Sequence, residues 1–149
     1  MTTTGSGLTR DEERAIEQDC QKVLLSLFHA VDEFDYETAI SLFVEDGTWH
    51  RLGKPYTGHE ALRKELNARS PTQVIRHVAT NIIVTVIDAD HAESVLYVTT
   101  YKHDDGVKHD GAVNIQTPLR LGVVRDRLVR RPEGWRIQEQ GLQFVFEFA

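Results

Sequence analysis

One histidine lies where a base catalyst would be useful. His77 belongs to the run 74–88, VIRHVATNIIVTVID, whose β-branched residues are typical of a strand. Alternation along a strand places these residues on one face: His77, Ala79, Asn81, Ile83 and Thr85. That mixed face suits the lining of a cavity, and a neutral imidazole there can accept a proton from a substrate. The alternative is a hydrogen-bonded structural histidine, which is the commoner role in an apolar strand.

An acidic residue occupies a comparable position on a helix. Thr9 and Glu12 form a capping box, and the spacing of apolar residues predicts one long helix from Thr9 to about Asp35. Projection at about 100° per residue places Asp32 at the edge of the apolar stripe, beside Phe28. His29 falls on the opposite side. Asp32 is therefore expected to turn inward, although an acid at the end of a helix is disfavoured by the helix dipole.

The remaining elements predict an α+β fold with a strongly curved, mostly antiparallel sheet. Asp35 caps a second helix, 36–43, and a third helix covers 59–69. Short strands are expected at 48–52 and 54–57, where Trp49 and Tyr56 are candidates for cavity walls or for ordinary core residues. Later strands are expected at 92–102, at 112–130 with a break near Pro118, and at 135–148. In the last strand the apolar face switches near Gly141, which predicts a β-bulge.

The polar stretch 103–111, HDDGVKHDG, contains two histidines and three aspartates. Its glycines and its position between two strand patterns favour a solvated turn. None of its spacings matches a metal motif with a known mechanism, so we expect no metal site.

Composition limits the classes of protein that remain. A chain of 149 residues is one domain, here 9–149, preceded by a tail at 1–8 that we expect to be disordered. The net charge of −6 argues against a nucleic-acid surface. Cys20 is the single cysteine, which excludes an internal disulfide, and it is expected in the core. No leader or membrane segment is apparent, so a cytoplasmic protein is expected.

Four segments in order resemble the SnoaL-like branch of the nuclear-transport-factor-2-like (NTF2-like) superfamily: FDYETAISLFVEDGTW, YTGHEALRKEL, IRHVATNIIV and GVVRDRLVRRPEGWRI. The resemblance implies an NTF2-like (cystatin-like) cone, in which three N-terminal helices and a curved sheet enclose a pocket. The last motif departs from the family pattern, because Val124 occupies a position where a tyrosine is usual.

The resemblance also implies a catalytic pair. In the bile-acid dehydratases and the hexachlorocyclohexane dehydrochlorinase of this group, a helix aspartate pairs with a strand histidine, and the matching residues are Asp32 and His77. Two further polar residues of those enzymes correspond to Leu27 and Gln140. The carboxylate would orient the imidazole for dehydration, elimination or isomerisation without a cofactor. Residues expected to contact the substrate are Trp49, Tyr56, Asn81, Gln140, Leu27 and Phe28.

Three functions remain open. The first is a lyase or isomerase that acts on a small, largely apolar cyclic molecule. The second is a non-catalytic module that binds a small hydrophobic ligand or only dimerises, which Leu27, Val124 and Gln140 favour. The third is the small subunit of a ring-hydroxylating oxygenase. A homodimer is expected from the sheet face that the helices leave uncovered.

Overall fold

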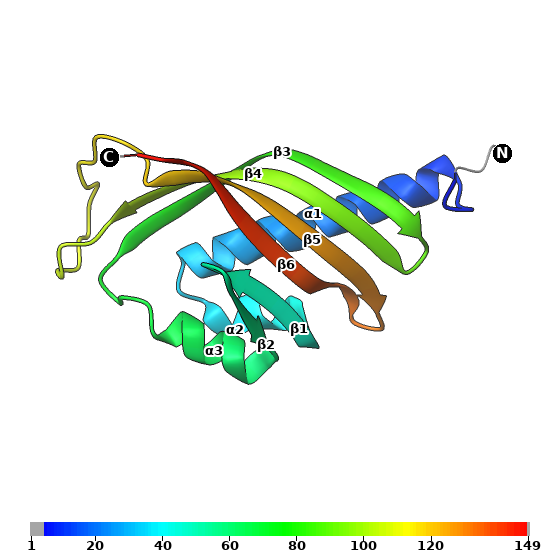
Figure 1. Ribbon diagram of the computed structural model, residues 1–149, viewed down its shortest axis with the longest axis horizontal. Helices are drawn as coiled ribbons and strands as arrows, with labels where there is room; N and C mark the ends of the chain where they lie inside the picture. Colours follow the sequence, from blue (N-terminus) through cyan, green and yellow to red (C-terminus); the bar gives the residue numbers. More distant parts are fainter. Residues whose placement is uncertain (1–4, 149) are drawn as a thin grey trace.

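The computed structural model describes residues 5–148 and contains three helices and a six-stranded sheet, which confirms the α+β class. In chain order the elements are α1 (Arg10–Asp32), α2 (Tyr36–Ser41), β1 (Phe43–Arg51), β2 (Lys54–Thr57), α3 (His59–Asn67), β3 (Val74–Asp88), β4 (His91–His103), β5 (Arg120–Arg131) and β6 (Gly134–Glu147). The long strands arch over α1, while α2, α3 and the β1–β2 pair lie together below them (Figure 1).

The sheet order is β2-β1-β6-β5-β4-β3, and every pair is antiparallel except β1 with β6. The pairing of β1 with β6 brings the segment that follows α2 beside the last strand of the chain. One row of paired residues crosses five strands on the inner face: Ser94, Asp126, Gln140, Trp49 and Tyr56. A second row, His77, Thr100 and Arg120, crosses β3, β4 and β5.

Helix α1 begins with the predicted capping box, in which the side chains of Thr9 and Glu12 bond each other's backbone N–H groups. Its apolar stripe packs into the concave side of the sheet, and Cys20 and Leu24 are fully buried. Burial raises the pKa of the Cys20 thiol to about 12. Asp35 caps α2 through the backbone N–H of Thr38, as expected.

The prediction for the faces of β3 was wrong beyond Ala79. Asn81 has φ 54° and lies in a bulge, where the pairing with β4 shifts between Thr80 and Ile83. The extra residue reverses the alternation, so Ile82 and not Ile83 packs against the core. Asn81 is consequently exposed and lies away from the interior.

Two other predictions need correction. The strand expected at 112–130 begins only at Arg120, and residues 104–119 form an irregular loop. The face switch in β6 occurs near Gln138, where the register with β5 shifts, a few residues before the predicted Gly141. A second shift follows near Val145, so Leu142 and Phe144 face inward while Phe146 is exposed.

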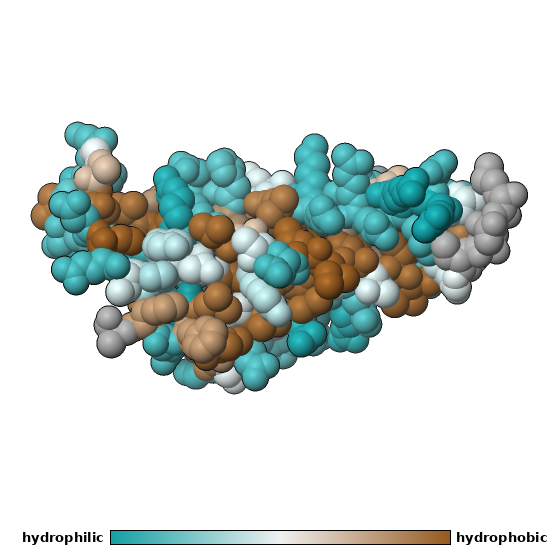
Figure 2. Space-filling view, turned by 90° about the horizontal axis from the view of Figure 1, so that it is seen from above, coloured by the Kyte–Doolittle hydropathy of each residue, from teal (hydrophilic) through white to brown (hydrophobic). Residues whose placement is uncertain are grey.

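The described N-terminal segment and the outer face of the sheet lie outside the core. Residues 5–8 of the expected tail form turns, and Leu8 packs against the core; residues 1–4 lie outside the described range. Within the described residues, no helix is long and apolar enough to cross a membrane. Exposed apolar side chains on β3 and β4 include Val78, Tyr97 and Tyr101. The space-filling view shows apolar patches among hydrophilic side chains (Figure 2).

Candidate functional site

Asp32 and His77 are in direct contact, as expected. Asp32 Oδ1 lies 2.5 Å from His77 Nδ1, and Asp32 Oδ2 accepts a hydrogen bond of 2.9 Å from the His77 backbone N–H. The Asp32 side chain is buried and the His77 side chain is 16% exposed. Because both carboxylate oxygens of Asp32 bind His77, the imidazole ring is held in one orientation. The carboxylate also favours the tautomer of His77 that carries its proton on Nδ1.

The local sequence explains why the pair forms. Asp32 is the last residue of α1, where the helix dipole disfavours a negative charge. The two donors of His77 offset this cost, because hydrogen bonds to a charged acceptor are stronger than neutral ones. Phe28, one turn earlier, packs against the imidazole with ring centroids 5.5 Å apart. The ring is thus held from both sides, and Nε2 has no partner among residues 5–148.

His77 lines two adjoining cavities between the sheet and the helices. The inner cavity, of about 90 Å³, is mostly apolar, and the outer one, of about 300 Å³, is more polar. Residues common to both are Val31, Trp49, His77, Thr100, Arg120, Leu142 and Phe144. A basic nitrogen beside a largely apolar space is suited to proton abstraction, since apolar walls restrict the water that competes for the base.

Four of the six expected substrate-contact residues line the inner cavity: Leu27, Phe28, Trp49 and Gln140. Tyr56 does not line either cavity. It pairs with Trp49 across β1 and β2 and lies behind it, with ring centroids 6.3 Å apart. Asn81 is also outside, because of the bulge described above. The placement leaves the roles of the four lining residues as predictions.

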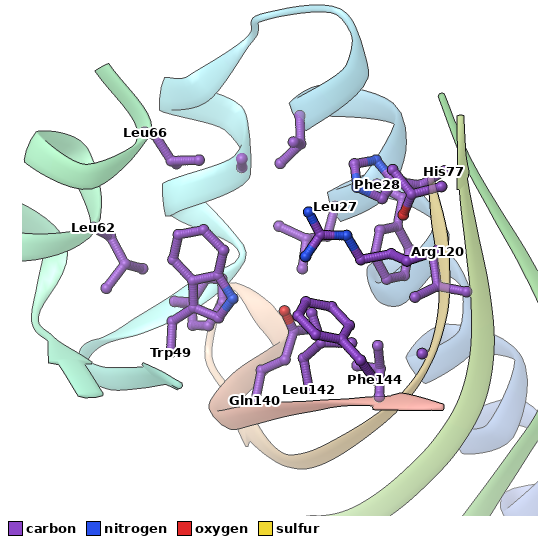
Figure 3. A pocket seen from close by; sticks show the side chains of 17 residues that line it. Leu27, Phe28, Trp49, Leu62, Leu66, His77, Arg120, Gln140, Leu142 and Phe144 are labelled. Atoms are coloured by element: carbon purple, nitrogen blue, oxygen red, sulfur yellow. The ribbon is translucent and has the colours of Figure 1, made fainter. Parts of the chain in front are cut away.

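Gln140 has a fixed orientation. Its Nε2 donates a 2.7 Å hydrogen bond to Asp126 Oδ1, which leaves the amide oxygen on the cavity side (Figure 3). Asp126 is buried on the inner face of β5, and Ser94 Oγ lies 3.5 Å from its other oxygen. Burial raises the pKa of Asp126 to about 7, against the opposing effect of these two hydrogen bonds. No feature of the sequence alone had distinguished this acid from the basic residues around it.

Arg120 is a charged residue of both cavities that the sequence analysis did not identify. It is the first residue of β5, and its guanidinium lies 4.3 Å from the centroid of the Phe144 ring. In the close-up, the side chain reaches across the cavity from the side of His77 towards Trp49 (Figure 3). Because the predicted strand 112–130 placed Arg120 in its middle, the sequence did not indicate that this residue lies at a cavity. Its alternation with Gly122 and Val124 was the available signal.

A second group of histidines lies at the end of β4 and in the loop that follows it. His109 Nε2 lies 2.9 Å and His103 Nε2 3.4 Å from Asp105 Oδ2, and the three ligand atoms lie within 4.8 Å of one another. The hydrogen bond from His109 is the largest of several effects that lower the pKa of Asp105 to about 2. These ion pairs account for the arrangement, and the expected absence of a metal there stays a prediction.

Comparison with known proteins agrees with this architecture. A candidate scytalone dehydratase from Novosphingobium aromaticivorans is 16% identical and superposes with a TM-score of 0.78, covering 95% of this chain and 93% of its own. An NTF2-like protein with a cystatin-like fold from the same species is 19% identical, with a TM-score of 0.74 and coverages of 93% and 89%. A protein from Catenulispora acidiphila is 25% identical, with a TM-score of 0.73 and coverages of 89% and 93%.

These structural likenesses establish the NTF2-like, cystatin-like fold. A search of curated protein sequences finds no match. The model of the SnoaL-like domain matches residues 12–140, which include α1, all six strands up to Gln140 and both residues of the Asp32–His77 pair. Since that match covers most of the chain, the protein belongs to the SnoaL-like domain family.

Proposed function

We propose that the protein is a cofactor-independent lyase or isomerase in which His77 is the general base and Asp32 orients it. The substrate is a small, largely apolar cyclic molecule. The observation that carries the proposal is the contact between Asp32 and Nδ1 of His77, which leaves Nε2 without a partner in the described part of the chain, on a residue that lines a largely apolar cavity.

The reaction follows from this geometry. His77 Nε2 takes a proton from a carbon atom of the substrate, and the negative charge of Asp32 stabilises the imidazolium that forms. The electron pair of the broken C–H bond forms a double bond while a leaving group departs from the neighbouring carbon. When that group is hydroxide, the imidazolium returns its proton and water is released. In an isomerisation no group leaves: the electron pair of the broken C–H bond displaces an existing double bond of the substrate, and the far carbon of that bond takes the proton back from the imidazolium.

Solvent exchange tests proton abstraction without knowledge of the natural leaving group. Cyclic ketones with one and two rings are incubated in deuterium oxide, and deuterium uptake beside the carbonyl is followed by NMR. We expect exchange with the wild-type protein and loss of exchange in His77→Gln. The control is His91→Gln, because His91 also pairs with an aspartate, Asp88, but does so on the exposed β3–β4 turn. Equal exchange in all three proteins would contradict the proposal.

A binding module without catalysis is the second candidate. Leu27, at a position where related enzymes have a polar residue, adds only apolar surface to the inner cavity. This favours retention of a hydrophobic ligand over protonation of a leaving group. The same deuterium experiment separates the candidates, because a binding module would show ligand-induced thermal stabilisation with no exchange in any variant.

A further inference from the structure

The lining of the two cavities has a charge opposite to that of the whole protein. The chain carries a net charge of −6, yet the lining contains four basic residues and one carboxylate: Arg51, Arg69, Lys102 and Arg120, with Glu65. Arg51 and Glu65 form an ion pair with each other. The other three basic side chains have no ion pair among the described residues. Such a concentration of unpaired positive charge in a concave site favours an anion.

Arg120 is the member of this group that faces both cavities. Contact with the Phe144 ring holds its guanidinium across the boundary between them, and no carboxylate of residues 5–148 lies within ion-pairing distance. Its row across the sheet continues through Thr100 to His77. With neighbouring strands about 4.8 Å apart, the backbones of Arg120 and His77 are separated by roughly 10 Å. Both side chains line the same two cavities, so a single ligand there can contact both.

Arg69 supplies a second observation at the outer cavity. It follows α3, and its Nη1 atom is buried without a hydrogen-bond partner in the described residues. Burial lowers the pKa of this guanidinium from its usual value, which is the mark of a charge that lacks full solvation. The guanidinium lies 5.8 Å from the centroid of the Tyr36 ring, and Arg69 lines the outer cavity, so its positive charge attracts an anion there.

The inner cavity has a different chemistry. Its walls include Leu27, Phe28, Trp49 and Leu62, and apart from Arg120 the charged side chains named above line only the outer cavity. A ligand that satisfies both parts has a flat apolar body and an anionic group at one end. Guanidinium groups match the planar, two-oxygen geometry of a carboxylate.

We infer that the substrate is a cyclic carboxylate, whose ring occupies the inner cavity and whose carboxylate binds Arg120 in the outer one. This rests on the proposed function only in treating the bound molecule as the substrate. Arg120 then determines specificity by selecting the anionic end, and it orients the ring so that one face is presented to His77.

The test compares two ligands of equal shape, 2-naphthoate and the neutral 2-naphthamide, by isothermal titration calorimetry. We expect the wild-type protein to bind the carboxylate roughly 10–100-fold more tightly, the range that a charge-assisted hydrogen-bond pair supplies. Arg120→Gln should remove this preference, and Arg120→Lys should retain part of it. The matched control is Arg125→Gln, which removes an exposed charge from the same strand and should keep the full preference.

Two further measurements test whether the preference for the carboxylate is electrostatic and whether it is independent of His77. Salt should weaken 2-naphthoate binding to the wild-type protein and leave 2-naphthamide binding nearly unchanged, which requires no variant to fold. His77→Gln should keep the preference for the carboxylate even if it abolishes proton exchange, so the two proposals fail independently. Equal affinity for both ligands in the wild-type protein, no binding of 2-naphthoate at millimolar concentration, or an unchanged preference in Arg120→Gln would overturn the inference.

Discussion

Of the regions in residues 5–148 that bring histidine and aspartate together, two can be compared directly, and only one of them adjoins a cavity. The Asp32–His77 pair joins the end of α1 to β3, residues 45 apart in the chain, beside a cavity. The group of His103, Asp105 and His109 lies at the end of β4 and in the exposed loop that follows it, within seven consecutive residues. Both regions pair imidazole nitrogens with a carboxylate, through Nδ1 at 2.5 Å in the first and through Nε2 at 2.9 and 3.4 Å in the second. The difference teaches that tertiary burial and an adjoining apolar space, and not the residue pair itself, create the conditions for proton transfer.

The largest effect that separates the two regions should come from their histidines. We expect His77→Gln to lower the rate of proton exchange about 10²–10⁴-fold, because the general base is removed. His109→Gln should leave that rate unchanged. NMR-detected exchange at saturating ketone measures both. A comparable loss in the two variants would mean that the loop, and not the cavity alone, takes part in the reaction.

Removal of the aspartate from each region should have different effects on the free energy of unfolding. Asp32→Ala leaves two His77 donors without their acceptor in a buried position, and we expect the free energy of unfolding to fall by about 1–3 kcal/mol. Asp105→Ala should change it by less than about 0.5 kcal/mol, because exposed ion pairs contribute little. Urea unfolding followed by tryptophan fluorescence measures both. Equal changes would contradict the distinction between buried and exposed pairs.

Asp126 extends the comparison to a buried carboxyl that has no cationic partner among its hydrogen bonds. Its pKa in the folded protein is about 7, against an ordinary value of 3.8. Between these two pH values the folded protein holds the proton more tightly than the unfolded chain does, so stability falls as pH rises through this window. Asp126→Asn removes the titration.

We therefore expect Asp126→Asn to stabilise the protein by about 1–2 kcal/mol at pH 8 relative to wild type, less than a full shift of this size would give. The difference should disappear below the ordinary pKa of 3.8, where the wild-type carboxyl is neutral in both states. Thermal melts over a pH series check the sign. A stabilising effect that grows towards low pH would contradict the assignment of a raised pKa.

The smallest effect concerns metal ions at the loop. The ion pairs among His103, Asp105 and His109 already satisfy the ring nitrogen of His109 and the carboxylate. We expect a chelator to change neither the melting temperature nor the rate of proton exchange. A fall in melting temperature that added zinc reverses, and that His109→Gln removes, would show that this loop holds a metal.

The sequence predicted the elements of the site because its local signals were strong. The capping box at Thr9 and the helical spacing that follows predicted the orientation of Asp32 and His29, and His29 is exposed. The order of the four family motifs predicted the cone. The Asp32–His77 contact joins distant parts of the chain, and only the family resemblance suggested it before the structure was known.

The failures came from departures from regular geometry. A bulge adds one residue to a strand, so every side chain after it points to the opposite face from the one that simple alternation predicts. Asn81 was therefore assigned to the wrong face. The irregular loop 104–119 contains enough apolar residues to imitate a strand, and this obscured Arg120. The charge of a cavity depends on side chains from several elements, so it cannot be predicted from any single stretch of the sequence.

The buried Cys20 makes the opening of the fold measurable through the rate at which its thiol is labelled. Its thiol has no exposed surface and lies on the face of α1 that packs against the sheet, so a thiol reagent can reach it only when the helix separates from the strands. Because it is the single cysteine in the chain, the labelling rate reports that one opening event. Slower labelling with a cyclic carboxylate bound would show that the ligand locks together the two layers between which it lies.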